Sequence, residues 1–156
     1  MAGAIGAGLP VEDASGSMII DIGGGTTNIA VFSLSDIVVD KTLKTAGDEM
    51  DEDIINYVRN KYNILIGERS AEDIKILMGS AMPMKKEKKQ AIQGRDLLTG
   101  LPKTVELSSI EIREAIMNTI GIVTEAVKDA IEETPPELLK DLLTSGVYLA
   151  GYLFYH

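Results

Sequence analysis

The sequence predicts an α/β lobe that combines a mixed sheet with a small inserted α+β subdomain. Short β-branched runs separated by Gly-rich breaks indicate several strands near the start of the chain. A long amphipathic stretch indicates a helix in the second half, and a last short apolar run at 147–150 indicates a return to the sheet. We therefore expect a core subdomain made of residues 1–45 and 108–156, with residues 46–107 inserted as the small subdomain.

The first half of the chain alternates strand and turn signals before its first clear helix. Apolar, β-branched runs at 18–22, 26–34 and 37–43 are typical of buried strands. The glycine triplet between the first two runs is short enough for a hairpin turn. A helix is expected from about residue 46 to 62, because its apolar residues fall on one face and acidic residues crowd its first turns.

The second half is dominated by one long helix. Ser70 is expected to cap a short helix before it, and residues 91–98 and 101–107 are expected to form a β-hairpin. Ser108 is then expected to cap the long helix 109–133, with Glu111 three residues on, as in a capping box. Its apolar stripe consists of Ile112, Ile116, Ile120, Val123, Val127 and Ile131. This spacing predicts one continuous buried face.

The composition excludes several function classes. A formal net charge of −9 argues against nucleic acid as a partner, because binding its phosphates normally takes a basic patch. Cysteine is absent and the one histidine is His156, so disulfides, thiol nucleophiles and a buried catalytic triad are excluded. No apolar run of this sequence is long enough to span a membrane, so we expect a cytoplasmic chain.

The segment from Asp21 to Thr27 (DIGGGTT) carries the strongest chemical signal. A predicted strand ends in an acid, followed by three glycines and two hydroxyls. Glycines let successive N–H groups converge on an anion, and a carboxylate beside a phosphate suits Mg²⁺. The segment is neither a P-loop nor a dinucleotide-binding fingerprint. On these residues alone, a Gly-rich hairpin turn with a solvent-facing Asp stays open as the alternative.

The same segment resembles a phosphate loop of a known superfamily. A strand, DIGGGTT and a second strand are similar to the second phosphate loop of the actin and heat-shock-chaperone ATPases. Further stretches resemble the MreB family of bacterial actin-like proteins: 4–10, 46–51, 66–72, 94–103 and 134–138. The matches keep their order up to about Gly151, and such a series is far more specific than one glycine triplet.

The resemblance implies a nucleotide site. The residues that would contact the β- and γ-phosphates of ATP or GTP are Gly23, Gly24, Gly25, Thr26 and Thr27. Thr26 or Thr27 would also help place the attacking water, and Asp21 would lie beside Mg²⁺. Glu72 and Lys75 would approach the ribose and adenine, although without the resemblance a surface ion pair is the better interpretation. Gly151 would begin a second Gly-rich loop that supports the adenine.

Two departures from the family pattern affect these expectations. The aromatic tail 152–156 is unlike the family, and no first phosphate loop of the D-x-G-T-x-N type occurs. We therefore expect a truncated or frameshifted chain. In this superfamily the nucleotide-binding cleft lies between two lobes, so the chain would supply only one wall of that cleft. Weak nucleotide binding and no measurable hydrolysis follow. Edge strands without their partner lobe also predict self-association.

The resemblance further implies a nucleotide-dependent filament subunit that determines cell shape. Its expected partners are the nucleotide, further copies of itself and other cell-shape or cell-wall proteins, at the inner face of the membrane when in a filament. A sugar-kinase or chaperone-type ATPase and a nucleotide-free protein-interaction module remain alternatives. The basic run Lys85–Lys89 (KKEKK) could bind anionic lipid or a partner, but a solvated loop is the simpler interpretation.

Overall fold

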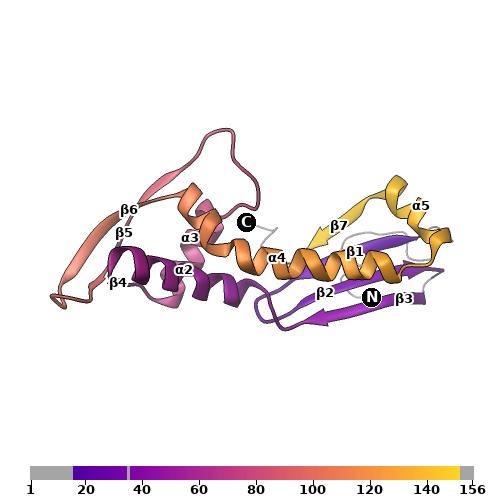
Figure 1. Cartoon of the computed structure of the whole chain (residues 1–156), viewed down its shortest axis with the longest axis horizontal. Helices are drawn as coiled ribbons and strands as arrows, with labels where there is room; N and C mark the ends of the chain where they lie inside the picture. Colours follow the sequence, from indigo (N-terminus) through magenta and orange to yellow (C-terminus); the bar gives the residue numbers. More distant parts are fainter. Residues whose placement is uncertain (1–15, 35, 152–156) are drawn as a thin grey trace. The chain divides into compact units, whose positions relative to one another are not determined.

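The structure, a computed structural model, describes residues 16–34 and 36–151 (Figure 1). The stretch 4–10, which carries part of the family resemblance, and the aromatic tail 152–156 lie outside the described residues. The chain divides into two compact units, each described by itself below. Unit 1 comprises residues 1–47 and 122–156, and unit 2 comprises residues 48–121.

Unit 1 is built on a four-stranded mixed sheet with the strand order β3-β2-β1-β7. β1 (Ser17–Ile22), β2 (Thr27–Ser33) and β3 (Asp36–Leu43) pair antiparallel in sequence order. β7 (Val147–Ala150) lies parallel to β1 on its other side. The predicted strands and the predicted mixed sheet are therefore confirmed.

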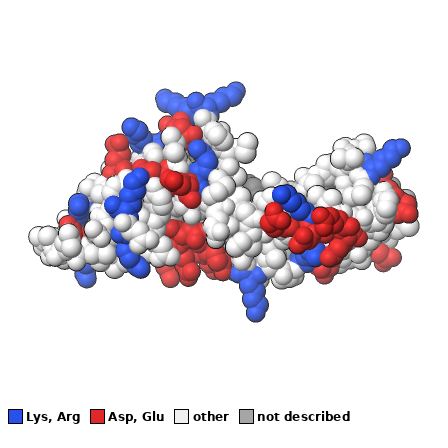
Figure 2. Space-filling view, in the orientation of Figure 1, with Lys and Arg blue, Asp and Glu red and all other residues white. Residues whose placement is uncertain are grey.

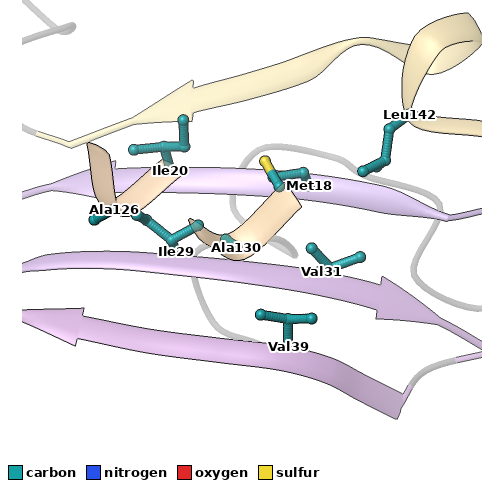
Figure 3. Packing of buried hydrophobic residues seen from close by; sticks show 8 residues of the cluster. All are labelled: Met18, Ile20, Ile29, Val31, Val39, Ala126, Ala130 and Leu142. Atoms are coloured by element: carbon teal, nitrogen blue, oxygen red, sulfur yellow. The ribbon is translucent and has the colours of Figure 1, made fainter. Parts of the chain in front are cut away.

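The core of unit 1 lies on one face of this sheet, as Figure 3 shows. The C-terminal part of α4 (Ser109–Glu133) and α5 (Pro136–Ser145) contribute side chains to it. Its buried members are Met18, Ile20, Ile29, Val31, Val39, Ala126, Ala130 and Leu142. The opposite face buries a smaller cluster around Ile19 and Phe32, as the period-2 alternation of strands requires. Each fully buried Ile, Leu or Val contributes about 1.5–3 kcal/mol.

The apolar stripe of α4 is confirmed except at its end. Ile112, Ile116 and Val123 are buried, but Ile131 is 38% exposed. Ala126 and Ala130 occupy the buried positions of the last turns, and their small side chains suit a helix lying close to a sheet. The spacing of four, four, three, four and four residues drifts against the 3.6-residue turn, which carries Ile131 off the buried face.

Unit 2 joins two helices, the first part of α4 and a small antiparallel sheet. Its helices are α2 (Gly47–Tyr62) and α3 (Glu68–Met78), and its strands are β4 (Ile64–Leu65), β5 (Lys89–Asp96) and β6 (Pro102–Ser108). β5 and β6 form the predicted hairpin, and β4 adds to β5. The buried residues include Met50, Ile54, Val58, Ile64, Ile74, Met78, Ile92, Leu107, Ile112 and Ile116.

The helix starts illustrate one confirmed and one wrong prediction. The Ser108 hydroxyl accepts from the Glu111 N–H at 3.2 Å, and the Glu111 carboxylate accepts from the Ser108 N–H at 3.1 Å. This is the predicted capping box. Ser70, however, lies inside the first turn of α3, whose N-cap is Gly67 in an extended conformation without a side-chain cap.

The boundary between the units falls inside α4. Residues up to Gly121 belong to unit 2, and those from Ile122 onward belong to unit 1. The sequence predicts this division at the start of the helix, between 107 and 108. The difference arises because one continuous helix contributes its first half to one core and its second half to the other. Within residues 16–34 and 36–151, no helix is both long and apolar enough to cross a membrane.

Candidate functional site

The Gly-rich segment forms the turn between β1 and β2, as predicted. Ile22 pairs with Thr27 at the end of the ladder, which leaves Gly23 to Thr26 as the loop. The Gly23 N–H donates to the Thr26 carbonyl oxygen at 2.9 Å. This bond closes the loop, and it also uses the amide of Gly23, which sequence reasoning had assigned to a phosphate.

Two hydrogen bonds tie the loop to the start of α2. The Thr27 hydroxyl donates to the Thr45 carbonyl oxygen at 2.8 Å, and the Thr27 side chain is fully buried. The Gly47 N–H donates to the Gly23 carbonyl oxygen at 3.1 Å. Because a hydroxyl has a single proton, Thr27 has none left for a ligand oxygen in this arrangement. Thr26, the other predicted threonine, is exposed.

Gly151 supports the same end of the sheet from β7. Its φ is +125°, and a Cβ added there would lie 2.0 Å from the Ile22 carbonyl oxygen. Only glycine fits such an approach without movement of the backbone. The structure therefore places Gly151 directly against the strand that leads into the loop, and it explains the glycine by packing alone.

The outer part of the loop remains open. Gly25 and Thr26 are exposed, and a Cβ added to Gly25 would meet no atom within 4 Å. The hydrogen bonds within the described part of the chain do not use the N–H groups of Gly25 and Thr26. Neither Gly23 nor Gly25 is among the described glycines with positive φ. At position 25, therefore, neither packing nor a left-handed φ requires glycine.

Asp21 lies on β1, near the end of that strand. It pairs directly with Asn28 on β2, so both side chains stand on the same face of the sheet. The Asn28 side-chain oxygen accepts from the Thr42 hydroxyl at 2.9 Å, and Asp21 is half-buried. In residues 16–34 and 36–151, no group of three or more His, Cys, Asp or Glu could hold a metal. A lone carboxylate suits Mg²⁺ when phosphate oxygens and water complete its shell.

Glu72 and Lys75, the predicted ribose and adenine contacts, lie on α3 in unit 2. Lys75 is only 4% exposed, and its Nζ lies 2.8 Å from Asp51 Oδ1 on α2. Burial raises the pKa of the Asp51 carboxyl, while the Lys75 ammonium opposes the rise and the half-buried Glu72 adds to it. The alternative of a surface pair is wrong for Lys75, which joins two helices. The nucleotide contacts of both residues stay a prediction.

Sequence reasoning missed the residues that contact the loop in unit 1 and Lys75 in unit 2. Thr45, Gly47 and Asp51 were seen only as the approach to α2 and its acidic first turns. Thr45 acts through its backbone carbonyl, which leaves no trace in residue type. Asp51 carried one signal, because an acidic residue on the buried side of an amphipathic helix needs a cation nearby.

Comparisons with known proteins show clear relatives. A family model described as MreB/Mbl protein matches residues 1–152. The chain is 47% identical over 148 residues to the cell shape-determining protein Mbl of Bacillus cereus, covering 95% of this chain and 44% of that protein. It is 48% identical over 151 residues to the cell shape-determining protein MreB of Escherichia coli, covering 97% and 44%.

Solved structures are similar as well. The crystal structure of MreB5 of Spiroplasma citri bound to ADP matches with a TM-score of 0.93 and 44% identity, over 96% of this chain and 46% of that one. The MamK double helical filament matches with a TM-score of 0.69 and 21% identity, over 86% and 41%, which bears on the fold alone. The chain thus spans less than half the length of the relatives it matches.

Proposed function

The chain belongs to the MreB/Mbl family and has its actin-like α/β fold, and from this premise we propose that it works as part of a nucleotide-dependent, cell-shape filament subunit. Relatives that are 47% and 48% identical are named for determining cell shape. The family favours this function over the sugar-kinase and chaperone-type alternatives. Because the chain spans 44% of those relatives, the activity of a whole subunit is carried over as a proposal.

The proposed ligand is ATP or GTP, held by its phosphates at the loop between β1 and β2. The observation that carries this is an exposed turn whose outer amides, those of Gly25 and Thr26, have no acceptor among the described residues. Hydrogen bonds from Thr27 and Gly47 hold this turn at the end of the sheet. A pre-organised set of amides can bind an anion without a basic side chain, which suits a chain with a net charge of −9.

Each group at the loop would have a distinct role toward the phosphates. The Gly25 and Thr26 amides would donate to phosphate oxygens, and the Thr26 hydroxyl would donate a further bond or hold a water. Thr27 would act through the backbone by fixing the loop against Thr45. Asp21 would contribute one oxygen ligand to Mg²⁺, which would neutralise part of the phosphate charge. Gly24 would let the phosphates approach, while Gly23 closes the turn.

Self-association is the proposed use of the bound nucleotide. MreB5 of Spiroplasma citri, a relative of this chain, has been solved with ADP and with AMPPNP bound. We infer that the present chain binds the same class of ligand, and that it contributes one lobe to a filament subunit. The remaining partners proposed are other cell-shape proteins.

The first test is the thermal unfolding of the chain with and without Mg-ATP or Mg-GTP. We expect millimolar nucleotide to raise the melting temperature, because a ligand that binds the folded state alone stabilises it. Gly25→Asp should abolish the rise, since it places a carboxylate where the phosphates would lie. The variant should still fold, because a Cβ at Gly25 meets no atom within 4 Å.

Gly67→Asp is the matched control. It adds the same charge at another glycine with open space, at the N-cap of α3, where Asp is favoured. We expect the rise with nucleotide to survive in this variant. If nucleotide does not raise the melting temperature of the unchanged, folded chain, the proposal is contradicted. A nucleotide-free interaction module is then the better interpretation.

A further inference from the structure

The strand β5 has an open edge on the side of β4. β4 pairs only with Arg95 and Asp96, because the chain leaves the sheet after Leu65 and soon enters α3. On the other edge, β6 pairs with β5 all the way from Lys89 to Arg95. Among the described residues, no strand therefore pairs with residues 89–94 on the β4 side.

The register of the sheet shows which main-chain groups of β5 face this open edge. The Leu97 N–H donates to the Asn63 carbonyl oxygen, just before β4, at 2.9 Å. The Asp96 N–H donates to the opposite side, to the carbonyl oxygen just before β6, at 2.8 Å. Hydrogen-bonding direction alternates along an antiparallel strand. The N–H and C=O groups of Ala91 and Gln93 therefore point to the open edge.

These main-chain groups have little competition from the chain itself. The Gln90 side-chain nitrogen lies 3.4 Å from the Ala91 carbonyl oxygen, and a bond of this length from an exposed side chain is weak. The Gln93 groups at this edge have no partner among the described residues. An open strand edge of this kind binds a further extended chain through main-chain hydrogen bonds.

A groove of about 230 Å³ lies between this edge and α3. It is lined by residues 90–93 of β5 and by Ser70, Asp73, Ile74 and Leu77 of α3. The α3 wall is apolar at Ile74 and Leu77, and Leu77 is 48% exposed. Asp73 is the one charged side chain of the lining, and it takes part in none of the ion pairs among the described residues. The groove thus offers an unpaired carboxylate and an apolar wall beside the open edge.

The two ends of the groove differ in charge. β4, which leads into α3, pairs with the end of β5, so the start of α3 lies near that end. Lys88 Nζ donates to the Leu77 carbonyl oxygen at 3.1 Å, so the end of α3 lies near the start of β5. α3 and β5 therefore run antiparallel, and the groove leads from Asp73 toward the lysine run 85–89. Figure 2 shows Lys and Arg side chains gathered at the outer end of the segment with this run.

We propose that an extended segment of a partner protein binds in this groove as a strand antiparallel to β5. Its main chain would bond to Ala91 and Gln93, and its side chains would contact α3. Asp73 and Leu77 are four residues apart on a helix, about 6 Å along the axis, which is close to the roughly 6.6 Å between alternate residues of a strand. The segment should therefore carry a basic residue, an apolar residue two positions later, and an acidic residue two positions after that, near the lysines.

A single strand is the shape that fits this edge. The β5 edge of a second copy is flanked by its own α3 in the same way, so it cannot enter the groove. The charged residue at one end and the lysines at the other favour one direction of the bound strand. Every residue involved lies in unit 2, so the inference is independent of the phosphate loop in unit 1.

The test uses two acetylated and amidated peptides of equal composition. Thr-Lys-Thr-Val-Thr-Glu-Thr has the expected order of charges, and Thr-Glu-Thr-Val-Thr-Lys-Thr has the reverse order. The full ¹⁵N-labelled chain is titrated with each peptide at low ionic strength, and its amide signals are followed by NMR. We expect the first peptide to move the signals of Ala91 and Gln93. It should bind about two- to fivefold more tightly than the second, as expected for one exposed ion pair.

Two variants locate the contact. Asp73→Asn should weaken binding of the first peptide by about two- to fivefold. Asp129→Asn, an exposed position of α4 in unit 1, is the matched control and should leave binding unchanged. Gln93→Pro should abolish binding, because proline removes the N–H that faces the open edge while the hydrogen bonds to β6 stay. The signals of β6 show whether the hairpin of this variant is intact.

Several results would overturn the proposal. They are unmoved signals of Ala91 and Gln93 at millimolar peptide in a folded chain, equal affinity for the two peptides, or an equal loss in Asp129→Asn. Full binding by a folded Gln93→Pro chain would also contradict strand addition. Self-association that Gln93→Pro removes, without peptide binding, would assign the edge to a second copy and overturn the proposal as well.

Discussion

At the scale of residues, the two neighbouring threonines of the loop have different environments. The Thr27 hydroxyl donates to the Thr45 carbonyl and is buried, whereas Thr26 is exposed. The sequence shows both as equal candidates for a phosphate contact. What separates them is a hydrogen bond to a carbonyl 18 residues away, which no local pattern reveals. We therefore assign the structural role to Thr27 and propose Thr26 as the residue that faces the ligand.

Thr27→Val should lower the stability of the fold, whereas Thr26→Val should weaken nucleotide binding. Valine keeps the shape of Thr27 but removes its donor, which leaves the Thr45 carbonyl without this bond. We expect a loss of about 1–3 kcal/mol in the free energy of unfolding, measured by urea titration. Thr26→Val should leave that free energy almost unchanged and weaken the binding of Mg-ATP. Unchanged stability in Thr27→Val, with nucleotide binding lost only there, would reverse the assignment.

At the scale of elements, the start of α4 shows how side chains set a helix boundary. Glu111 takes part in the capping box with Ser108, accepts from the Tyr62 hydroxyl at 2.5 Å, and lies 2.9 Å from Lys61 Nζ. Burial acts to raise its pKa, but the hydrogen bonds from Tyr62 and Lys61 outweigh burial, and the pKa of Glu111 is lowered. The ionised carboxylate therefore stabilises the link between α4 and α2.

This lowered pKa predicts an acid-dependent loss of stability. The stabilisation is fully present above the pKa of an unfolded glutamate, about 4.3, and is lost as the pH falls through the lower folded value. Glu111→Gln should lower the free energy of unfolding at neutral pH and flatten its decrease below about pH 4. Unfolding by urea across this pH range measures both. A decrease of equal steepness in the variant would assign the acid dependence to other carboxylates, and Glu125→Gln, on an exposed turn of α4, serves as the control.

Most elements could be predicted because their periodicity is local. The strands β1, β2, β3 and β7 and the long helix α4 follow from period-2 and near-3.6 patterns. β4 was missed because two residues are too short to show a period. The start of α3 was misplaced because Gly67 caps it without a side chain. At the site, the loop could be located from its glycines, but its anchors at Thr45, Gly47 and Gly151 depend on tertiary contacts.

At the scale of the whole molecule, the chain consists of two units that carry different surface chemistry. Unit 1 presents backbone amides at the turn between β1 and β2, whereas unit 2 presents the exposed lysines of the run 85–89. The nucleotide proposal depends on the first of these surfaces alone. The chain belongs to a family whose members are named for cell shape.

The most direct measurement is a titration of the ¹⁵N-labelled chain with Mg-ATP, followed by the amide signals in NMR spectra. We expect the N–H signals of Gly25 and Thr26 to move with added nucleotide. The signal of Gly100, at the turn of the β5–β6 hairpin, should stay in place. Saturating nucleotide that leaves the Gly25 and Thr26 signals unmoved, in a chain that remains folded, would contradict phosphate binding at this loop.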